Sequence, residues 1–266
     1  MKCGHLFNGI SGFGLAASWM GWENYMHCEI DPFCNKIMKK HFPNSIEHGD
    51  IKTTDFTIYR GIIDVLTGGF PCQPYSAAGK RKGESDNRNL WPEMLRAIYE
   101  IQPTWIVGEN VRGIINWDGG VAFNKIQFDL EIEGYEILPF LLPACSIGAS
   151  HQRERVWFVA YKSNQIIEPY ISDTDSNGIQ RCWIPKNPIK DRQRRQDSQA
   201  HLFNQKGFAT GYSFESESEL IRADDGLPYW MDRVKSLGNA IVPQVVFQIF
   251  KTIELYQQIY ASTLPK

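Results

Sequence analysis

The sequence of 266 residues lacks the marks of several protein classes. Its six cysteines include no CxxC pair and no combination with histidine at zinc-binding spacing, so we expect neither a metal site nor a redox dithiol. The longest apolar run, residues 137–145, contains prolines and is too short to span a bilayer, and the N-terminal segment lacks the apolar stretch of a signal peptide. These absences predict a cytoplasmic protein without membrane contact, whose thiols stay reduced.

An excess of positive charge is also missing. The chain has 28 basic and 30 acidic residues, a net charge of −2. A nucleic-acid partner would therefore have to meet positive charge gathered on one face.

Short apolar runs alternate with segments of helical periodicity over the first 160 residues. We expect the following strands: residues 4–7, 25–30, 62–66, 105–107, 137–142 and 156–160. Helices are expected between them, for example over residues 90–101, and a C-terminal helix begins near Val242. This alternation predicts an α/β protein with a mainly parallel sheet that is covered by helices on both faces.

The pattern changes after Ala160. Residues 161–220 are polar, without clear periodicity, and include a basic run at residues 186–196 with aromatic residues around it. We interpret this segment as a small, loop-rich module, and residues 1–160 with 221–266 as the main domain.

A glycine-rich stretch, FNGISGFG, lies between the first expected strand and a helix. Such a turn lets a ligand approach backbone N–H groups and the helix N-terminus. Glu29 follows Gly9 by twenty residues, the spacing at which a carboxylate accepts hydrogen bonds from a ribose. The pattern favours an adenosine-containing cofactor over a turn that serves packing alone, and leaves open whether that cofactor is a dinucleotide or S-adenosylmethionine.

Cys72 stands between two prolines in TGGFPCQP, directly after an expected central strand. Pro71 and Pro74 restrict the backbone on both sides of the thiol, as a nucleophile with a constant attack direction requires. A buried structural cysteine in a stiff turn is the alternative. Glu109 ends the next apolar run, and we expect it at the same rim of the sheet if the two strands are neighbours. Arg153 and Arg155 alternate in HQRER and so face the same way if the chain is extended there, where they could favour a thiolate or hold phosphates.

Taken in order, these stretches resemble the cytosine-C5 DNA methyltransferases. The likeness rests on FNGISG, GGFPCQPYS, GENV, HQRER and GNAIVPQV, and it covers residues 6–160 and 237–246. It implies a Rossmann-like methyltransferase sheet with helices on both faces, a small target-recognition module inserted before the last motif, and duplex DNA as the partner.

The resemblance also implies a role for each matching residue. Cys72 would attack C6 of a flipped-out cytosine, Glu109 would act as the acid at N3, and Arg153 and Arg155 would support the site. S-adenosyl-L-methionine would be the methyl donor, with Glu29 on its ribose, Asp50 on the adenine amino group and Ile51 on the ring. The remaining residues of that pocket would be Phe7, Gly9, Gly12, Leu90 and Asn239.

Three features depart from the family pattern: Ser11 replaces a glycine, His151 stands where a glutamine is usual, and the recognition module is short. The leading hypothesis is a prokaryotic or phage-encoded enzyme of restriction–modification or genome protection that associates with the nucleoid. Its oligomeric state is open, with a monomer on DNA as the working expectation. Transfer-RNA methylation, or a non-catalytic nucleic-acid-binding role, are the alternatives.

Overall fold

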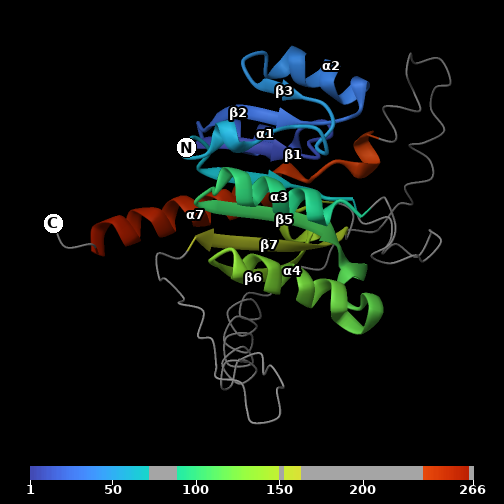
Figure 1. Cartoon of the computed structure of the whole chain (residues 1–266), viewed down its shortest axis with the longest axis vertical. Coiled ribbons are helices and arrows are strands. Elements are labelled where there is room, and N and C mark those ends of the chain that lie inside the picture. Colours follow the sequence, from blue (N-terminus) through green and yellow to red (C-terminus); the bar gives the residue numbers. More distant parts are fainter. Residues whose placement is uncertain (72–88, 150–152, 163–235, 264–266) are drawn as a thin grey trace, which may run out of the picture. The chain divides into compact units, whose positions relative to one another are not determined.

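The computed structural model describes residues 1–71, 89–149, 153–162 and 236–263 (Figure 1). The chain divides into two compact units, Met1–Gln165 with Ser218–Lys266, and Ile166–Glu217. All described residues belong to the first unit. Cys72 and nearly all of the predicted recognition module lie outside the described residues, so the domain assignment stays a prediction.

A seven-stranded sheet with the order β3-β2-β1-β4-β5-β7-β6 forms the centre of the first unit. Strands β1 to β5 are parallel, and β7 pairs antiparallel with both β5 and β6. This arrangement confirms the mainly parallel sheet. The strands are β1 (Lys2–Leu6), β2 (Glu23–Cys28), β3 (Ile46–His48), β4 (Val65–Gly68), β5 (Trp105–Val111), β6 (Tyr135–Pro143) and β7 (Glu154–Lys162).

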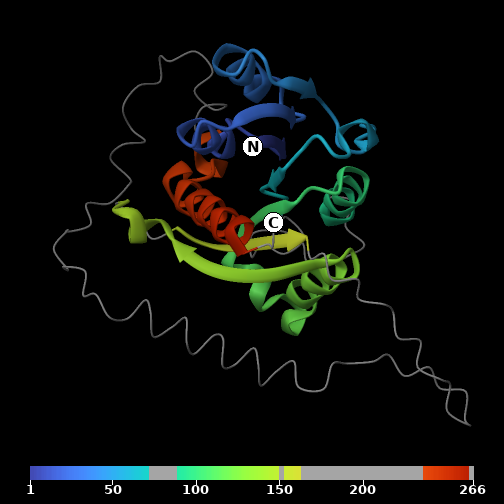
Figure 2. The ribbon, with the colours of Figure 1, turned by 90° about the vertical axis from the view of Figure 1, so that its left-hand side faces the viewer.

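Helices connect the strands and cover the sheet. The α-helices are α1 (Gly12–Trp19), α2 (Pro32–His41), α3 (Trp91–Ile101), α4 (Val121–Ile132) and α7 (Pro243–Thr263). Short 3₁₀ turns are η1 (Thr57–Tyr59), η4 (Arg112–Ile115), η5 (Trp117–Gly120) and η6 (Ala144–Ile147). Figure 2 shows α1 and α7 on one face of the sheet and α3 and α4 on the other, so helices lie on both faces, as the alternating pattern predicts.

Each face of the sheet has its own apolar core. Val65 faces α1 and α7, while its neighbour Leu66 faces α3 and α4, because successive strand residues point to opposite sides. The α7 helix buries Val246 and Phe250 fully, and the Phe250 ring lies 4.7 Å from that of Trp22. The C-terminal helix therefore completes the core of the N-terminal strands.

A buried polar network connects three strands under the glycine-rich loop. In β1, the His5 ring bonds through Nε2 to Asn24 Oδ1 at 2.7 Å and through Nδ1 to Thr67 Oγ1 at 2.8 Å. Asn24 donates its amide N–H to the carbonyl of Gly14 at 3.1 Å, so its Oδ1 accepts from the ring. Burial lowers the pKa of His5 to about 4, and the ring is therefore neutral, with its proton on Nε2.

The observed bounds of all six expected strands differ from the sequence-based expectation, most of all at β4 and β5. The expected strand at residues 62–66 begins only at Val65 and continues to Gly68, because Ile62 and Ile63 donate to the carbonyl of Tyr59 in a turn. The expected strand at residues 105–107 extends to Val111, since pairing with β7 continues to Arg155. The three-residue strand β3 was not predicted, because its exposed residues carry no apolar run.

Candidate active site

The register of the sheet places the predicted site residues along one edge. His48, Cys28, Leu6, Gly68 and Gly108 are aligned across five neighbouring parallel strands. The residues that follow them therefore meet at the carboxyl edge of the sheet, where open α/β sheets bind ligands. These residues are Asp50, Glu29, Phe7, Gly69 and Glu109. The expected neighbour relation between the strand before Cys72 and the strand of Glu109 is confirmed, since β4 pairs with β5.

The glycine-rich loop after β1 has an unusual backbone. Phe7, Gly9 and Ser11 all have positive φ angles, of 50°, 53° and 69°. A Cβ atom added at Gly9 would meet nothing within 4 Å, so the loop has open space in front of it. Ser11 takes the left-handed conformation that glycine adopts more easily, which is a physical reason for the glycine that the motif usually has at this position.

Glu29 is held by backbone N–H groups at the end of β2. Gly9 N donates to its Oε2 at 2.7 Å, and Asp31 N donates to its Oε1 at 2.8 Å. Asp31 in turn caps α2 by accepting from Phe33 N at 2.9 Å. The carboxylate is therefore fixed beside the glycine-rich loop, and each of its oxygens keeps a lone pair for a further donor.

Asp50 and Ile51 form the turn after β3. Asp50 is half-buried, and its Oδ1 accepts from Lys52 N at 2.9 Å, while the Ile51 side chain is buried. Leu90 lies half-buried directly before α3, and its carbonyl accepts from Met94 N. These residues lie in the loops in which the sequence predicted them.

The C-terminal motif packs against the glycine-rich loop. A Cβ atom added at Gly12 would lie 2.5 Å from the carbonyl oxygen of Ile241, so only glycine fits there. Arg153 donates to the carbonyls of Gly238 and Ala240, at 2.8 and 2.6 Å, and thereby holds the turn that carries the exposed Asn239. In this structure Gly12, which was predicted to line the cofactor pocket, packs against Ile241. Arg153, which was predicted to support the catalytic site, donates to main-chain carbonyls of the C-terminal motif.

An ion pair between the buried Glu109 and the half-buried Arg155 occupies the other part of the edge. The Glu109 side chain lies within the sheet, and its Oε1 is 2.9 Å from Nε of Arg155. Desolvation raises the pKa of Glu109 above its ordinary value, although the charges of Arg155 and Arg153 act in the opposite direction. A Cβ atom added at Gly69 would lie 3.5 Å from Oε2 of Glu109. Glu109 therefore borders the start of the loop that carries Cys72.

Asn110 is a site residue that the sequence reasoning did not single out. Its side chain is buried and donates to the carbonyl of Phe70 at 3.3 Å, two residues before Cys72. Its Oδ1 accepts from Val111 N at 2.8 Å. The asparagine of GENV thus connects β5 to the nucleophile loop, and its place beside Glu109 in the motif was the available signal.

The cofactor edge has the features that an adenosine ligand needs. Open space lies in front of Gly9, an oriented carboxylate lies at Glu29, and the amide of Asn8 and the hydroxyl of Ser11 are buried without a hydrogen-bond partner. The residues present therefore fit such a group. Within the described ranges, no three His, Cys, Asp or Glu side chains come together as metal ligands, and no helix is long and apolar enough to cross a membrane.

A parallel sheet with this glycine-rich loop, acid and terminal hairpin has the Rossmann-like methyltransferase fold. The S. pombe Dnmt2 methyltransferase has a similar structure, with a TM-score of 0.60 that covers 96% of this chain and 99% of that one. Its sequence is 17% identical, so this likeness shows the fold alone.

The family model for C-5 cytosine-specific DNA methylases matches residues 1–210, and the chain belongs to this family. Among curated relatives, the Type II methyltransferase M.Eco47II of Escherichia coli is 38% identical over 162 residues, which are 60% of this chain and 39% of that protein. M.PspPI of Psychrobacter sp. is 42% identical over the same shares of the two chains. The chain thus spans about two fifths of the length of these relatives.

Proposed function

We propose that the protein transfers a methyl group from S-adenosylmethionine to C5 of a cytosine in duplex DNA. The observation that carries this proposal is the ion pair of the buried Glu109 with Arg155, which borders Gly69 three residues before Cys72. The two curated relatives are named Type II methyltransferases, which supports a role in restriction–modification. The likeness to the Dnmt2 structure concerns the fold and favours no second substrate.

The edge near β1 to β3 would hold the cofactor. Glu29 would accept hydrogen bonds from the ribose hydroxyls, and Asp50 would accept from the adenine amino group. Ile51, Leu90, Phe7 and the turn at Asn239 would enclose the rest of the ligand. When bound, this cofactor supplies an electrophilic methyl group on its sulfonium.

The edge near β4, β5 and β7 would activate the base. We propose that the Cys72 thiolate forms a bond to C6 while Glu109 donates a proton to N3, which places electron density at C5. C5 would take the methyl group and release S-adenosylhomocysteine. A base or water would then take the C5 proton as the thiolate leaves C6, and N3 would return its proton to Glu109. Burial supports the acid role, because a carboxyl group with a raised pKa retains its proton at higher pH than an exposed one.

Base flipping and target recognition would involve residues outside those described. A cytosine inside a duplex is out of reach of the thiol, and extruding it costs roughly a few kcal/mol. We propose that residues 161–220 make the DNA contacts, with the basic run on phosphates. On this proposal the protein acts in the bacterial cytoplasm and on the nucleoid.

Labelled S-adenosylmethionine with duplex DNA or transfer RNA as the acceptor tests the proposal. We expect 5-methylcytosine in duplex DNA only, and none with Cys72→Ala. Cys145→Ala is the matched control, because Cys145 is an exposed free thiol on the described surface. Methylation of transfer RNA alone, or normal methylation by Cys72→Ala, would refute the substrate or the mechanism. Bisulfite sequencing of DNA from an expressing host would then identify the target sequence.

A further inference from the structure

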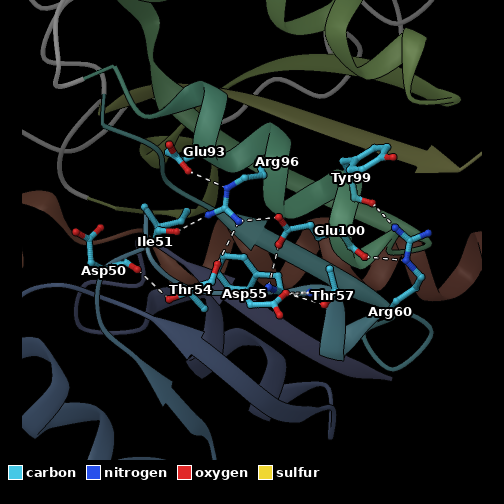
Figure 3. Close-up of polar contacts among 11 residues, drawn as sticks. Asp50, Ile51, Thr54, Asp55, Thr57, Arg60, Glu93, Arg96, Tyr99 and Glu100 are labelled. Atoms are coloured by element: carbon cyan, nitrogen blue, oxygen red, sulfur yellow. Dashed lines mark hydrogen bonds and ion pairs between the residues drawn. The ribbon is translucent and has the colours of Figure 1, made fainter.

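The segment between β3 and η1 is ordered by polar contacts and has little regular secondary structure. The hydroxyls of Thr53 and Thr54 donate to the carbonyl of Asp50, at 3.2 and 2.8 Å, and close a compact turn. The carbonyls of Ile51 and Thr54 accept no N–H bond within this turn. Their partner comes from a helix forty residues further along the chain, at Arg96 of α3 (Figure 3).

Arg96 bonds both ends of the turn with one guanidinium group. Its Nη2 donates to the carbonyl of Ile51 at 2.5 Å, and its Nη1 donates to the carbonyl of Thr54 at 3.1 Å. Only the planar, forked donor set of arginine can reach two diverging carbonyls and retain further N–H groups. The conformation of the turn that presents Asp50 therefore depends on the position of Arg96.

Two carboxylates on the same helix orient Arg96. Nε lies 3.0 Å from Oε2 of Glu93, and Nη1 lies 2.8 Å from Oε1 of Glu100. The other oxygen of Glu100 accepts from Phe56 N at 2.9 Å, so Glu100 also bonds the segment directly. Partial desolvation lowers the pKa of Arg96, but Glu100 and Glu93 outweigh it and the net pKa lies above the ordinary value. The guanidinium is therefore charged and held in one orientation.

A second arginine makes a superficially similar contact nearby. Arg60 donates through Nε to the carbonyl of Glu100 at 3.0 Å and through Nη2 to the carbonyl of Tyr99 at 2.8 Å. It thus joins the residue that follows η1, ten residues after Asp50, to the end of α3 opposite Glu93 (Figure 3). Arg60 contacts neither Ile51 nor Thr54 in these bonds.

We infer that Arg96 is a positioning residue for adenine recognition. It fixes the Asp50–Thr54 turn so that the carboxylate of Asp50 meets the exocyclic amino group of the cofactor and Ile51 meets its ring. The inference rests on the proposed function, because Asp50 contacts adenine only if the cofactor binds at this edge. Arg96 itself touches no cofactor atom and takes no part in the chemistry.

Binding of two ligands to the full chain tests the inference by calorimetry. S-adenosylhomocysteine carries the adenine amino group, and S-inosylhomocysteine replaces it with a carbonyl oxygen. The Arg96→Met variant should bind the adenosyl ligand about tenfold more weakly, the size expected for one charged hydrogen bond. It should bind the inosyl ligand less than about threefold more weakly, so that discrimination between the two ligands shrinks. In methyl transfer, KM for the cofactor should rise more than kcat falls.

Arg60→Met is the matched control, because it also removes two guanidinium bonds to main-chain carbonyls that join α3 to the chain around η1. It should leave both affinities and their ratio within about twofold of the parent protein. If Arg96→Met does not fold, Arg96→Lys retains the charge near Glu93 and Glu100 but not the fork, and it should show the same loss of discrimination. Equal weakening of both ligands, or unchanged discrimination, would overturn the inference while leaving the proposed function intact. Absence of binding by the parent protein would refute the proposed function itself.

Discussion

The two parts of the candidate site are held by different kinds of interaction. Around the cofactor edge (the loops after β1, β2 and β3), main-chain groups hold the side chains, as with Gly9 N and Asp31 N on Glu29. Around the catalytic edge (the end of β4 with β5 and β7), charged side chains face each other, as with Glu109 and Arg155. Main-chain donors fix a shape and do not titrate, whereas a buried carboxylate beside arginines sets a proton affinity. The difference suits binding at one edge and proton transfer at the other.

The largest expected effect separates the two edges by removing the acid. Glu109→Gln keeps the shape of the side chain but cannot deliver a proton, so methyl transfer should fall by about 10²- to 10⁴-fold. Binding of S-adenosylhomocysteine should stay within about threefold of the parent value, because Glu109 lies outside the cofactor edge. Single-turnover rates with labelled cofactor and calorimetry measure the two quantities.

Glu154→Gln is the matched control for this substitution. Glu154 begins β7 and also pairs with an arginine, Arg112, at 2.5 Å, but that pair is exposed. Loss of the Glu154–Arg112 ion pair should leave the methyl-transfer rate within about twofold of the parent rate, since exposed ion pairs contribute little. A Glu109→Gln rate within tenfold of the parent would contradict the assignment of Glu109 as the acid.

The next effect concerns stability, because the buried His5 of β1 and Glu109 at the catalytic edge should respond to pH in opposite directions. The pKa of the buried His5 ring is lowered from 6.5 to about 4, so the unfolded state binds the extra proton first. Its contribution to stability is present above pH 6.5 and is lost as the pH falls toward 4, by at most about 3 kcal/mol. The raised pKa of Glu109 acts the other way, and its contribution is lost as the pH rises above the ordinary carboxyl range.

Urea denaturation of the parent protein and of His5→Gln between pH 7 and pH 5 measures the contribution of His5. In His5→Gln the free energy of unfolding should fall less steeply on acidification than in the parent protein, whatever its absolute value. His27, whose pKa burial also lowers, is present in both proteins, so its contribution cancels in the comparison. Parallel pH curves for parent and variant would show that His5 does not contribute.

Much of the fold followed from the sequence because its signals are local. Alternating apolar runs predicted six of the seven strands, and the apolar face of residues 90–101 predicted α3, where Met94, Ile98 and Ile101 are buried. The spacing of Glu29 from Gly9 predicted a carboxylate at the end of the second strand, and Glu29 lies directly after β2, where it accepts from Gly9 N at 2.7 Å. Periodicity and spacing report such features directly, since each depends on residues close together in the chain.

The contacts between distant segments could not be predicted in the same way. Arg96 lies on a helix whose charged residues resemble any solvated face, and only the fold brings it to the carbonyls of Ile51 and Thr54. Arg153 and Arg155 were expected to face the same way if the chain is extended there. The chain is not extended at Arg153, whose φ is 30°, and the alternating sequence pattern gives no sign of this angle. That angle precedes the strand and sends the two side chains to different partners.

The smallest expected effect sharpens the comparison through this pair of arginines. Arg153→Met removes two hydrogen bonds to the turn at Gly238 and Ala240, which packs against the cofactor edge. It should weaken S-adenosylhomocysteine binding a few-fold, the size of about one neutral hydrogen bond. Because the charge of Arg153 also lowers the pKa of Glu109, but less than Arg155 does, the acid limb of the rate profile should move to higher pH by less than in Arg155→Met. Arg155 is the ion-pair partner of Glu109 and lowers the pKa of its carboxyl group. In Arg155→Met this effect is lost, so the pKa of Glu109 should rise further. The limb of the rate profile that reports the acid should then move to higher pH, with cofactor affinity nearly unchanged. Two arginines separated by one residue would thus give two separable kinetic signatures, and identical signatures would mean that the two edges form one coupled unit.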